Sequence, residues 1–313
     1  MNIKLITFLL FIFTITKINA QDSNYFNDNI KLLISTDKKS YLESERIWQE
    51  IKLIIPKNIK LDYKPILAIG HDFTQEVLSM SNKQVPYSGA IYHVIRNKED
   101  YPDTLRIFDV LDFGYFEEPS KYSMYLGSLY IIADKYKINA SVDISINGKK
   151  YKIKSEPWEF EVSKPEGDEA IAREKYRELF PMIVKLSPNE ERDTKKIADF
   201  MLNFMEQFPN SVYIDQVLIN GSYSYFENYP KSIDEEIEFW KAVILKYPNF
   251  ASNYRRMNRI LSCYIYKKDQ YGFLELVNEL ENKIGSNETF TKVLFYTMRN
   301  YERELKNNKF KKG

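Results

Sequence analysis

Few residues in this sequence are of the types that carry out catalysis or hold metal ions. His71 and His93 are the only histidines, and Asp72 adds a carboxylate beside the first. A structural zinc site needs four protein ligands, and no cysteine or third histidine lies nearby in the sequence to complete this set. We therefore expect surface or turn positions for both histidines, with no bound metal and no other cofactor.

The single cysteine, Cys263, excludes an intramolecular disulfide, so the fold has to be stabilised by burial of apolar surface. A catalytic thiolate would need a neighbouring base, and both histidines lie in the other half of the chain. The apolar residues around Cys263 have helical spacing. This pattern predicts a buried cysteine in a helix.

Adjacent carboxylates occur three times, at Glu117-Glu118, Glu190-Glu191 and Glu235-Glu236. The second and third pairs fall in the first turns of expected helices, where negative charge favours the helix dipole. The first pair lies in an acidic connection together with Asp109 and Asp112. A glycosidase would need two carboxylates at a defined separation, which sequence spacing alone does not fix.

Sequence motifs of the common enzyme classes are absent. There is no nucleophile elbow, phosphate-binding glycine loop, helical His-Glu-x-x-His or EF-hand loop. Asn220-Gly221-Ser222 lacks the flanking glycine that an elbow would need. We expect no catalytic residue and no enzymatic activity.

Aromatic residues are abundant, with 24 Tyr, 20 Phe and 3 Trp. Tyrosine offers a large amphipathic contact area at a low cost in conformational entropy, which suits a recognition surface. Two tyrosine-dense stretches are candidate binding sites, and they comprise Tyr115, Phe116, Tyr122, Tyr125, Tyr223, Tyr225 and Tyr229. The alternative is that these rings fill cores between helices and domains, and a Lys- and Asn-rich composition typical of genome bias favours this alternative.

The 45 Lys and Arg residues are balanced by 44 Asp and Glu residues, which leaves a formal net charge of +1. This balance gives no electrostatic basis for binding nucleic acid or an anionic membrane. The 44% of hydrophobic residues argues against a disordered chain. At 313 residues the chain is long enough for two domains, each with its own core.

Residues 1–20 have the pattern of a secretory signal peptide. Lys4 precedes an apolar run from Leu5 to Ile15, and the small Ala20 stands before the expected cleavage site. The run is shorter than the roughly 20 residues that span a bilayer, and no later stretch is long and apolar enough. The sequence therefore predicts an exported, soluble chain without a transmembrane segment, in the periplasm or outside the cell.

Residues 29–162 contain short alternating apolar runs separated by turn residues, which is typical of an antiparallel β-sandwich. The clearest piece runs from Lys137 to Lys154, where alternate apolar residues define a buried face and Asn147-Gly148 suits a tight hairpin turn. A strand is also expected at 47–55, with Trp48, Glu50 and Lys52 on its outward face. Further strand candidates are 90–95, 105–110 and 126–132.

The segment TDKKSYLESERIW at 36–48 resembles the opening of bacterial immunoglobulin-like and macroglobulin-type domains, although Ser44 stands where those domains usually have glycine. WEFEV at 158–162 and PEGDEA at 165–170 resemble the closing strand and exit linker of exported bacterial proteins in which such a sandwich precedes helical repeats. The resemblance implies a β-sandwich of a kind used in envelope adhesion, assembly or inhibition. It carries no catalytic motif, so it does not specify a function.

After residue 165 the apolar period becomes helical. The expected organisation is therefore a signal peptide at 1–20, an immunoglobulin-like sandwich at 21–165 and an all-α domain at 166–313, which is an α+β chain with segregated halves. Four apolar stripes begin at Ile197, Ile233, Phe273 and Phe290. Ser187 and Ser232 each precede a glutamate by three residues, which is the spacing of a capping box.

A weak internal repeat connects two parts of the helical half. FMEQFPN at 204–210 recurs as VILKYPN at 243–249, an offset of 39 residues. This aromatic-Pro-Asn corner resembles the helical hairpins of tetratricopeptide-type arrays, whose repeat is about 34 residues and whose concave face binds peptides or partner domains. A plain helical bundle is an equally good interpretation.

These features favour a non-enzymatic, exported interaction or scaffold protein that binds a protein partner in a bacterial envelope. Two alternatives belong to other classes. One is a protease inhibitor, because sandwich domains of the resembled type include inhibitors. The other is a glycan-binding module or weak hydrolase that uses tyrosine and tryptophan surfaces and the acidic connection.

Overall fold

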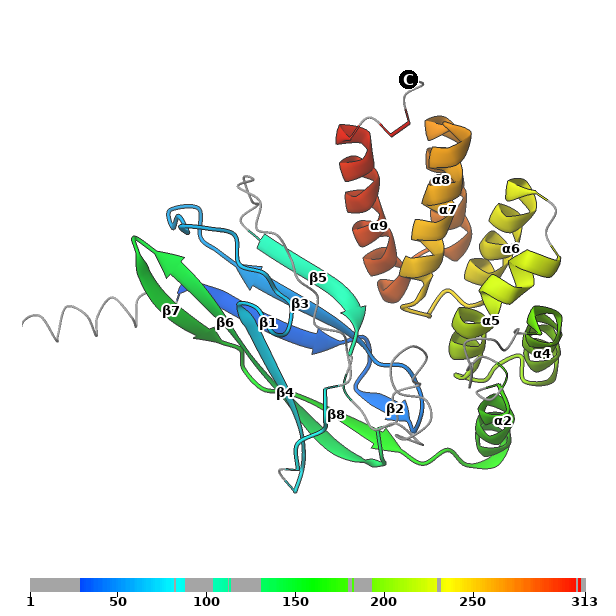
Figure 1. Ribbon diagram of the computed structural model, residues 1–313, viewed down its shortest axis with the longest axis horizontal. Helices are drawn as coiled ribbons and strands as arrows, with labels where there is room; N and C mark the ends of the chain where they lie inside the picture. The colour runs from blue at the N-terminus through cyan, green and yellow to red at the C-terminus, as the bar shows by residue number, and fades with distance from the viewer. Residues whose placement is uncertain are drawn as a thin grey trace, which may run out of the picture. The chain divides into compact units, whose positions relative to one another are not determined.

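The computed structural model describes residues 29–81, 83–87, 104–111, 113, 131–179, 182, 193–229, 232–307 and 309–310. Within them strands come first and helices follow, so the chain has an α+β layout with segregated parts (Figure 1). The expected signal peptide at 1–20 lies outside the described residues. No helix in the described part is long and apolar enough to cross a membrane.

The described residues divide into two compact units. The strand unit contains residues 29–41, 49–113 and 133–162. The helical unit contains the described residues from 163 onward, together with the segment 42–48 and residues 131–132. This segment connects two strands, yet it packs with the helices.

The strands form two sheets, one with the order β1-β3-β5 and one with the order β2-β8-β6-β4 and β7 paired with β6. Their bounds are β1 Lys31–Thr36, β2 Ser40–Leu42, β3 Trp48–Ile54, β4 Phe73–Ser79, β5 Thr104–Val110, β6 Asp134–Ile146, β7 Lys149–Lys154 and β8 Trp158–Ser163. The pairs β1/β3, β4/β6, β6/β7 and β6/β8 are antiparallel.

The predicted hairpin is confirmed as β6 and β7. Asn147 and Gly148 both have positive φ, at 52° and 75°, as the tight turn requires. The Asp62 carboxylate caps this turn, since it accepts hydrogen bonds from both backbone amides at 3.0 and 2.8 Å. It also accepts a bond from the hydroxyl of the buried Ser145.

The predicted outward face of β3 is wrong in its first half. Trp48 and Glu50 are 1% and 6% exposed. Glu50 forms an ion pair with the half-buried Lys52, whose Nζ lies 2.8 Å from Glu50 Oε2. The strand expected at 105–110 is confirmed as β5, whereas 90–95 and most of 126–132 lie outside the described residues.

The helices described after the strands are α2 Gly167–Arg177, α4 Thr194–Gln207, α5 Ile214–Asn228, α6 Ile233–Lys246, α7 Asn253–Lys267, α8 Gln270–Ile284 and α9 Glu288–Lys306. The four predicted stripes lie in α4, α6, α8 and α9, and most of their residues are buried in one core. Ser232 caps α6 as predicted, since its hydroxyl accepts a bond from the Glu235 amide. The box at Ser187 lies outside the described residues, and Asp193 caps α4.

The internal repeat is a repeat of structure. Helices α4 and α6 have 14 residues each, α5 and α7 have 15 each, and both pairs are offset by 39 residues. At the end of each first helix the amide of Phe208 or Tyr247 donates back to the residue four positions earlier, both at 2.9 Å. The hairpin α4-α5 therefore recurs as α6-α7, and α8 and α9 follow in contact with α7.

The segment 42–48 contains a turn that the helices hold in place. Ser44 has a φ of 68°, the left-handed region in which the glycine of the resembled domains is free of strain. Arg173 Nε donates to Ser44 Oγ at 3.2 Å, and the side-chain amide of Gln216 donates to the backbone carbonyl of Ser44. The Tyr213 hydroxyl donates to the Glu43 carbonyl at 2.7 Å. These bonds stabilise a backbone conformation that costs serine about 1 kcal/mol.

Candidate functional site: a polar groove between α7 and α9

Helix α7 places polar and apolar residues alternately along one side of a groove. Asn258, Leu261, Ser262 and Ile265 have the spacing i, i+3, i+4 and i+7, which puts them on one helix face. Leu261 is buried at the base of this face, while the Ser262 side chain is exposed. The helix ends at Lys268, whose φ of 57° is a left-handed C-cap.

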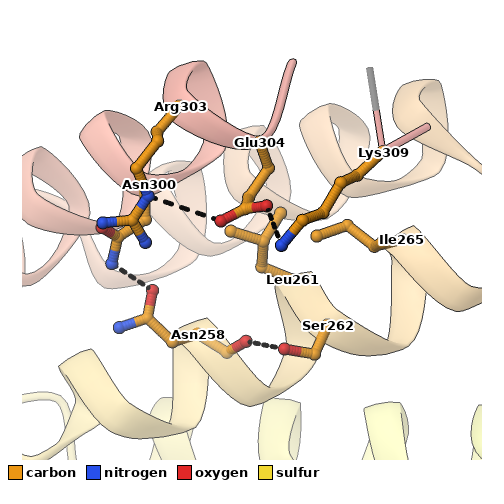
Figure 2. Close-up of a pocket in the computed structure, with 8 residues that line it drawn as sticks. All are labelled: Asn258, Leu261, Ser262, Ile265, Asn300, Arg303, Glu304 and Lys309. Carbon is orange, nitrogen blue, oxygen red and sulfur yellow. Dashed lines mark hydrogen bonds and ion pairs between the residues drawn. The ribbon is translucent and has the colours of Figure 1, made fainter. Parts of the chain in front are cut away.

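Helix α9 and the residues after it form the other side. Asn300, Arg303 and Glu304 face α7, and Lys309 closes one end (Figure 2). The hollow between them measures about 400 Å³ and is open to solvent. The chain is held in this position because the Lys309 amide donates to the Glu304 carbonyl, and the Phe310 ring packs on Tyr301.

Two carboxamides meet across the groove. Asn300 Nδ2 donates to Asn258 Oδ1 and to the Tyr254 hydroxyl, both at 2.9 Å. The Ser262 hydroxyl donates to the backbone carbonyl of Asn258 at 2.9 Å, one turn earlier in α7. The two bonds donated by Asn300 orient the carboxamides and leave the Asn258 NH₂ group and the Asn300 Oδ1 atom available to a ligand.

The groove holds one buried carboxylate and two exposed cations. Glu304 is 9% exposed, and its Oε2 lies 2.6 Å from Lys309 Nζ while its Oε1 lies 3.4 Å from Arg303 Nε. The hydrogen bond from Lys309 lowers the pKa of Glu304 more than burial raises it. Arg303 and Lys309 keep more than half of their side-chain surface exposed, so both can meet a second partner.

This arrangement can bind a ligand through hydrogen bonds and charge. Within the described ranges no group of three or more His, Cys, Asp or Glu residues could hold a metal ion. Cys263 lies on the neighbouring face of α7 and is buried as predicted. Burial raises the pKa of its thiol to about 11, so it is protonated and unreactive at neutral pH.

Two of the candidate tyrosines at the end of α5, Tyr225 and Tyr229, stack on each other with ring centroids 5.2 Å apart. Tyr223 is 69% exposed. Tyr225 is half-buried, with its ring stacked 4.4 Å from Phe239 of α6, as the core-filling alternative predicts. The Tyr229 hydroxyl donates to Asp199, and this hydrogen bond raises the pKa of Tyr229 and lowers that of Asp199.

Other candidates from the sequence have the following positions. His71 is half-buried in a turn before β4. Glu235 and Glu236 lie in the first turn of α6 as predicted, and Glu236 pairs with Arg259 at 2.5 Å. His93, Tyr115, Phe116, Tyr122, Tyr125, Glu117-Glu118, Asp112 and Glu190-Glu191 lie outside the described residues.

Sequence reasoning missed the groove residues. Asn258 and Asn300 are 42 positions apart, and each resembles an ordinary polar residue on a solvent-exposed helix face. One signal was available, since residues 253–267 contain four basic residues and no Asp or Glu. In a chain of nearly zero net charge, such a helix indicates a locally basic surface.

Comparison with models of known protein families finds no match for this chain, and comparison with curated protein sequences finds none either.

Proposed function

We propose that this protein is a non-enzymatic, exported interaction or scaffold protein of a bacterial envelope, and that its helical unit binds a protein partner. In this proposal the strand unit is an immunoglobulin-like sandwich and the helical unit is a tetratricopeptide-like array. The observation that carries the proposal is the repeat of the helical hairpin at a constant offset of 39 residues.

Stacked hairpins of this kind support partner binding because each adds a helix pair to an extended surface. Helix α7 contacts α6, α8 and α9, and α6 contacts α8, so the last four helices are packed around α7. The groove between α7 and α9 is a hollow on this array with polar groups already oriented by hydrogen bonds. Orientation before binding reduces the entropy that a complex loses.

The experiment that tests the function is site-specific photo-crosslinking in the native cells. A photoreactive phenylalanine analogue replaces Ser262 in the groove, or Glu275 on the exposed side of α8 as a matched control. We expect one dominant crosslinked protein from position 262, identified by mass spectrometry and recovered again when that protein is tagged. Absence of a crosslinked protein from both positions would contradict the proposal.

The same cells test the export that the proposal includes. We expect the chain in the periplasmic or extracellular fraction with Gln21 as its first residue, because the predicted cleavage site follows Ala20. A cytoplasmic chain that retains Met1 would rule out the envelope as the place of action.

A further inference from the structure

Charge is distributed unevenly over the last helices. Helices α6 and α8 carry more acidic than basic residues, whereas α7 carries only basic ones. The basic residues of α7 are Arg255, Arg256, Arg259 and Lys267. Three of these pair with carboxylates of other helices, namely Asp215, Glu236 and Asp234. These pairs offset most of the positive charge of α7, so the cations that line the groove come from α9 and the residues after it, namely Arg303 and Lys309.

Helix α9 adds cations along the rim of the groove. Phe295, Arg299 and Arg303 are spaced by four residues, so they lie on one helix face. Phe295 is 44% exposed, and the Arg299 guanidinium lies 5.8 Å from the centre of its ring. Of the described residues that line the groove, only Glu304 is acidic, and it is already engaged by Lys309 and Arg303.

The two carboxamides add a second requirement on the ligand. Asn258 offers a donor and Asn300 an acceptor, which together match the C=O and N–H of a peptide backbone. From Asn258 to Ile265 the helix rises about 10 Å, which an extended chain covers in about three residues. The groove therefore has the length and the polar groups for a short extended peptide.

We propose that the groove between α7 and α9 binds an acidic, extended segment of a partner protein, with a ligand carboxylate between Arg303 and Lys309 and the ligand backbone on Asn258 and Asn300. This inference rests on the proposed partner-binding function and specifies the chemistry of the partner. Charge complementarity favours this occupant because the exposed cations outnumber the single buried carboxylate.

The test is selection of a phage-displayed library of random octapeptides on the full mature chain. We expect the enriched peptides to carry an excess of Asp and Glu, and their affinity to fall as NaCl rises from about 50 to about 300 mM. For the best synthetic peptide, Arg303→Glu is expected to weaken binding by roughly tenfold or more, because it places like charges together. Asn258→Ala is expected to weaken binding without changing the salt dependence.

Lys292→Glu is the matched control, since Lys292 is a cation of α9 that pairs with Glu288 at 3.2 Å outside the groove. It should bind the peptide as the wild type does, and circular dichroism should show that all variants remain folded. Enrichment of neutral or basic peptides, equal binding by Arg303→Glu, or no enrichment would overturn the inference. If photo-crosslinking at position 262 still captures a partner in that case, the proposed function survives and only its chemistry is wrong.

Discussion

At the scale of single residues, a buried ion pair joins α5 to α7. Arg256 is 3% exposed, and its Nη2 lies 2.6 Å from Asp215 Oδ1. Its Nη1 donates to Asn253 at 2.7 Å, and the Ser252 hydroxyl donates to Asp215. Burial lowers the pKa of Arg256, while the Asp215 carboxylate acts in the opposite direction. Once one of these two charges is buried, the other is needed to compensate it. The pair as a whole adds little net stability compared with apolar residues of similar volume.

Removing one member of this pair should destabilise the helical unit more than removing both. We expect Asp215→Ala to lower the free energy of unfolding by about 3–5 kcal/mol, because Arg256 is left buried without a counter-charge. Asp215→Leu combined with Arg256→Met should recover most of that loss. Urea unfolding followed by circular dichroism measures both values. A double variant as unstable as the single one would show that the network contributes more than charge compensation.

Asp62 should make the strand unit sensitive to acid. The Ser145 hydroxyl, and then the turn amides, lower the pKa of this carboxyl from 3.8. A folded-state pKa below the unfolded value contributes stability that is present above about pH 4 and is lost as the pH falls through the folded value. Asp62→Asn should therefore reduce the slope of unfolding free energy against pH in this acid range. An unchanged slope in urea titrations at successive pH values would contradict the assignment.

At the scale of elements, local patterns predicted what local forces decide. The β6-β7 hairpin and the helical stripes follow from side-chain period and turn chemistry, and both are confirmed. The outward position of Trp48 was wrong because its burial depends on a residue distant in sequence, with the Arg255 guanidinium 5.3 Å from its ring centre. The groove was unpredictable for the same reason, since Asn258 and Asn300 meet only after α7 and α9 pack.

Gly221 shows how packing of α4 on α5 overrides helix propensity. A Cβ atom at this position would lie 2.9 Å from Met201 Cβ, closer than such atoms approach in proteins. Gly221→Ala should therefore lower the free energy of unfolding by about 1–3 kcal/mol, despite the gain of up to about 1 kcal/mol in helix propensity. Ser222→Ala, one position along the same helix, is the control and should be nearly neutral. Stabilisation by Gly221→Ala in urea unfolding would show that α4 and α5 are farther apart.

At the scale of the whole molecule, the division of the chain does not follow sequence order. The change of period near residue 165 led to a single expected boundary, but the segment 42–48 belongs to the helical unit. Hydrogen bonds between residues distant in sequence hold this segment on the helices, such as those from the Tyr213 and Gln216 side chains to the backbone carbonyls of Glu43 and Ser44. Sequence period carries no information about such bonds. The helical unit is therefore built from the chain after residue 163 and from a segment that precedes it by more than 100 residues.

A fragment of residues 163–313 should consequently be less stable than the helical unit of the full chain. Without segment 42–48, Tyr213 and Gln216 lose their acceptors, and each buried group left unpaired costs about 1–3 kcal/mol. We expect the fragment to unfold at a temperature lower by about 5 °C or more. A synthetic peptide of residues 40–50 should raise that temperature in a concentration-dependent way, because it binds the folded fragment. A scrambled peptide should have no effect. Equal melting of the fragment and of the helical transition in the full chain would show that segment 42–48 contributes no stability to the helices.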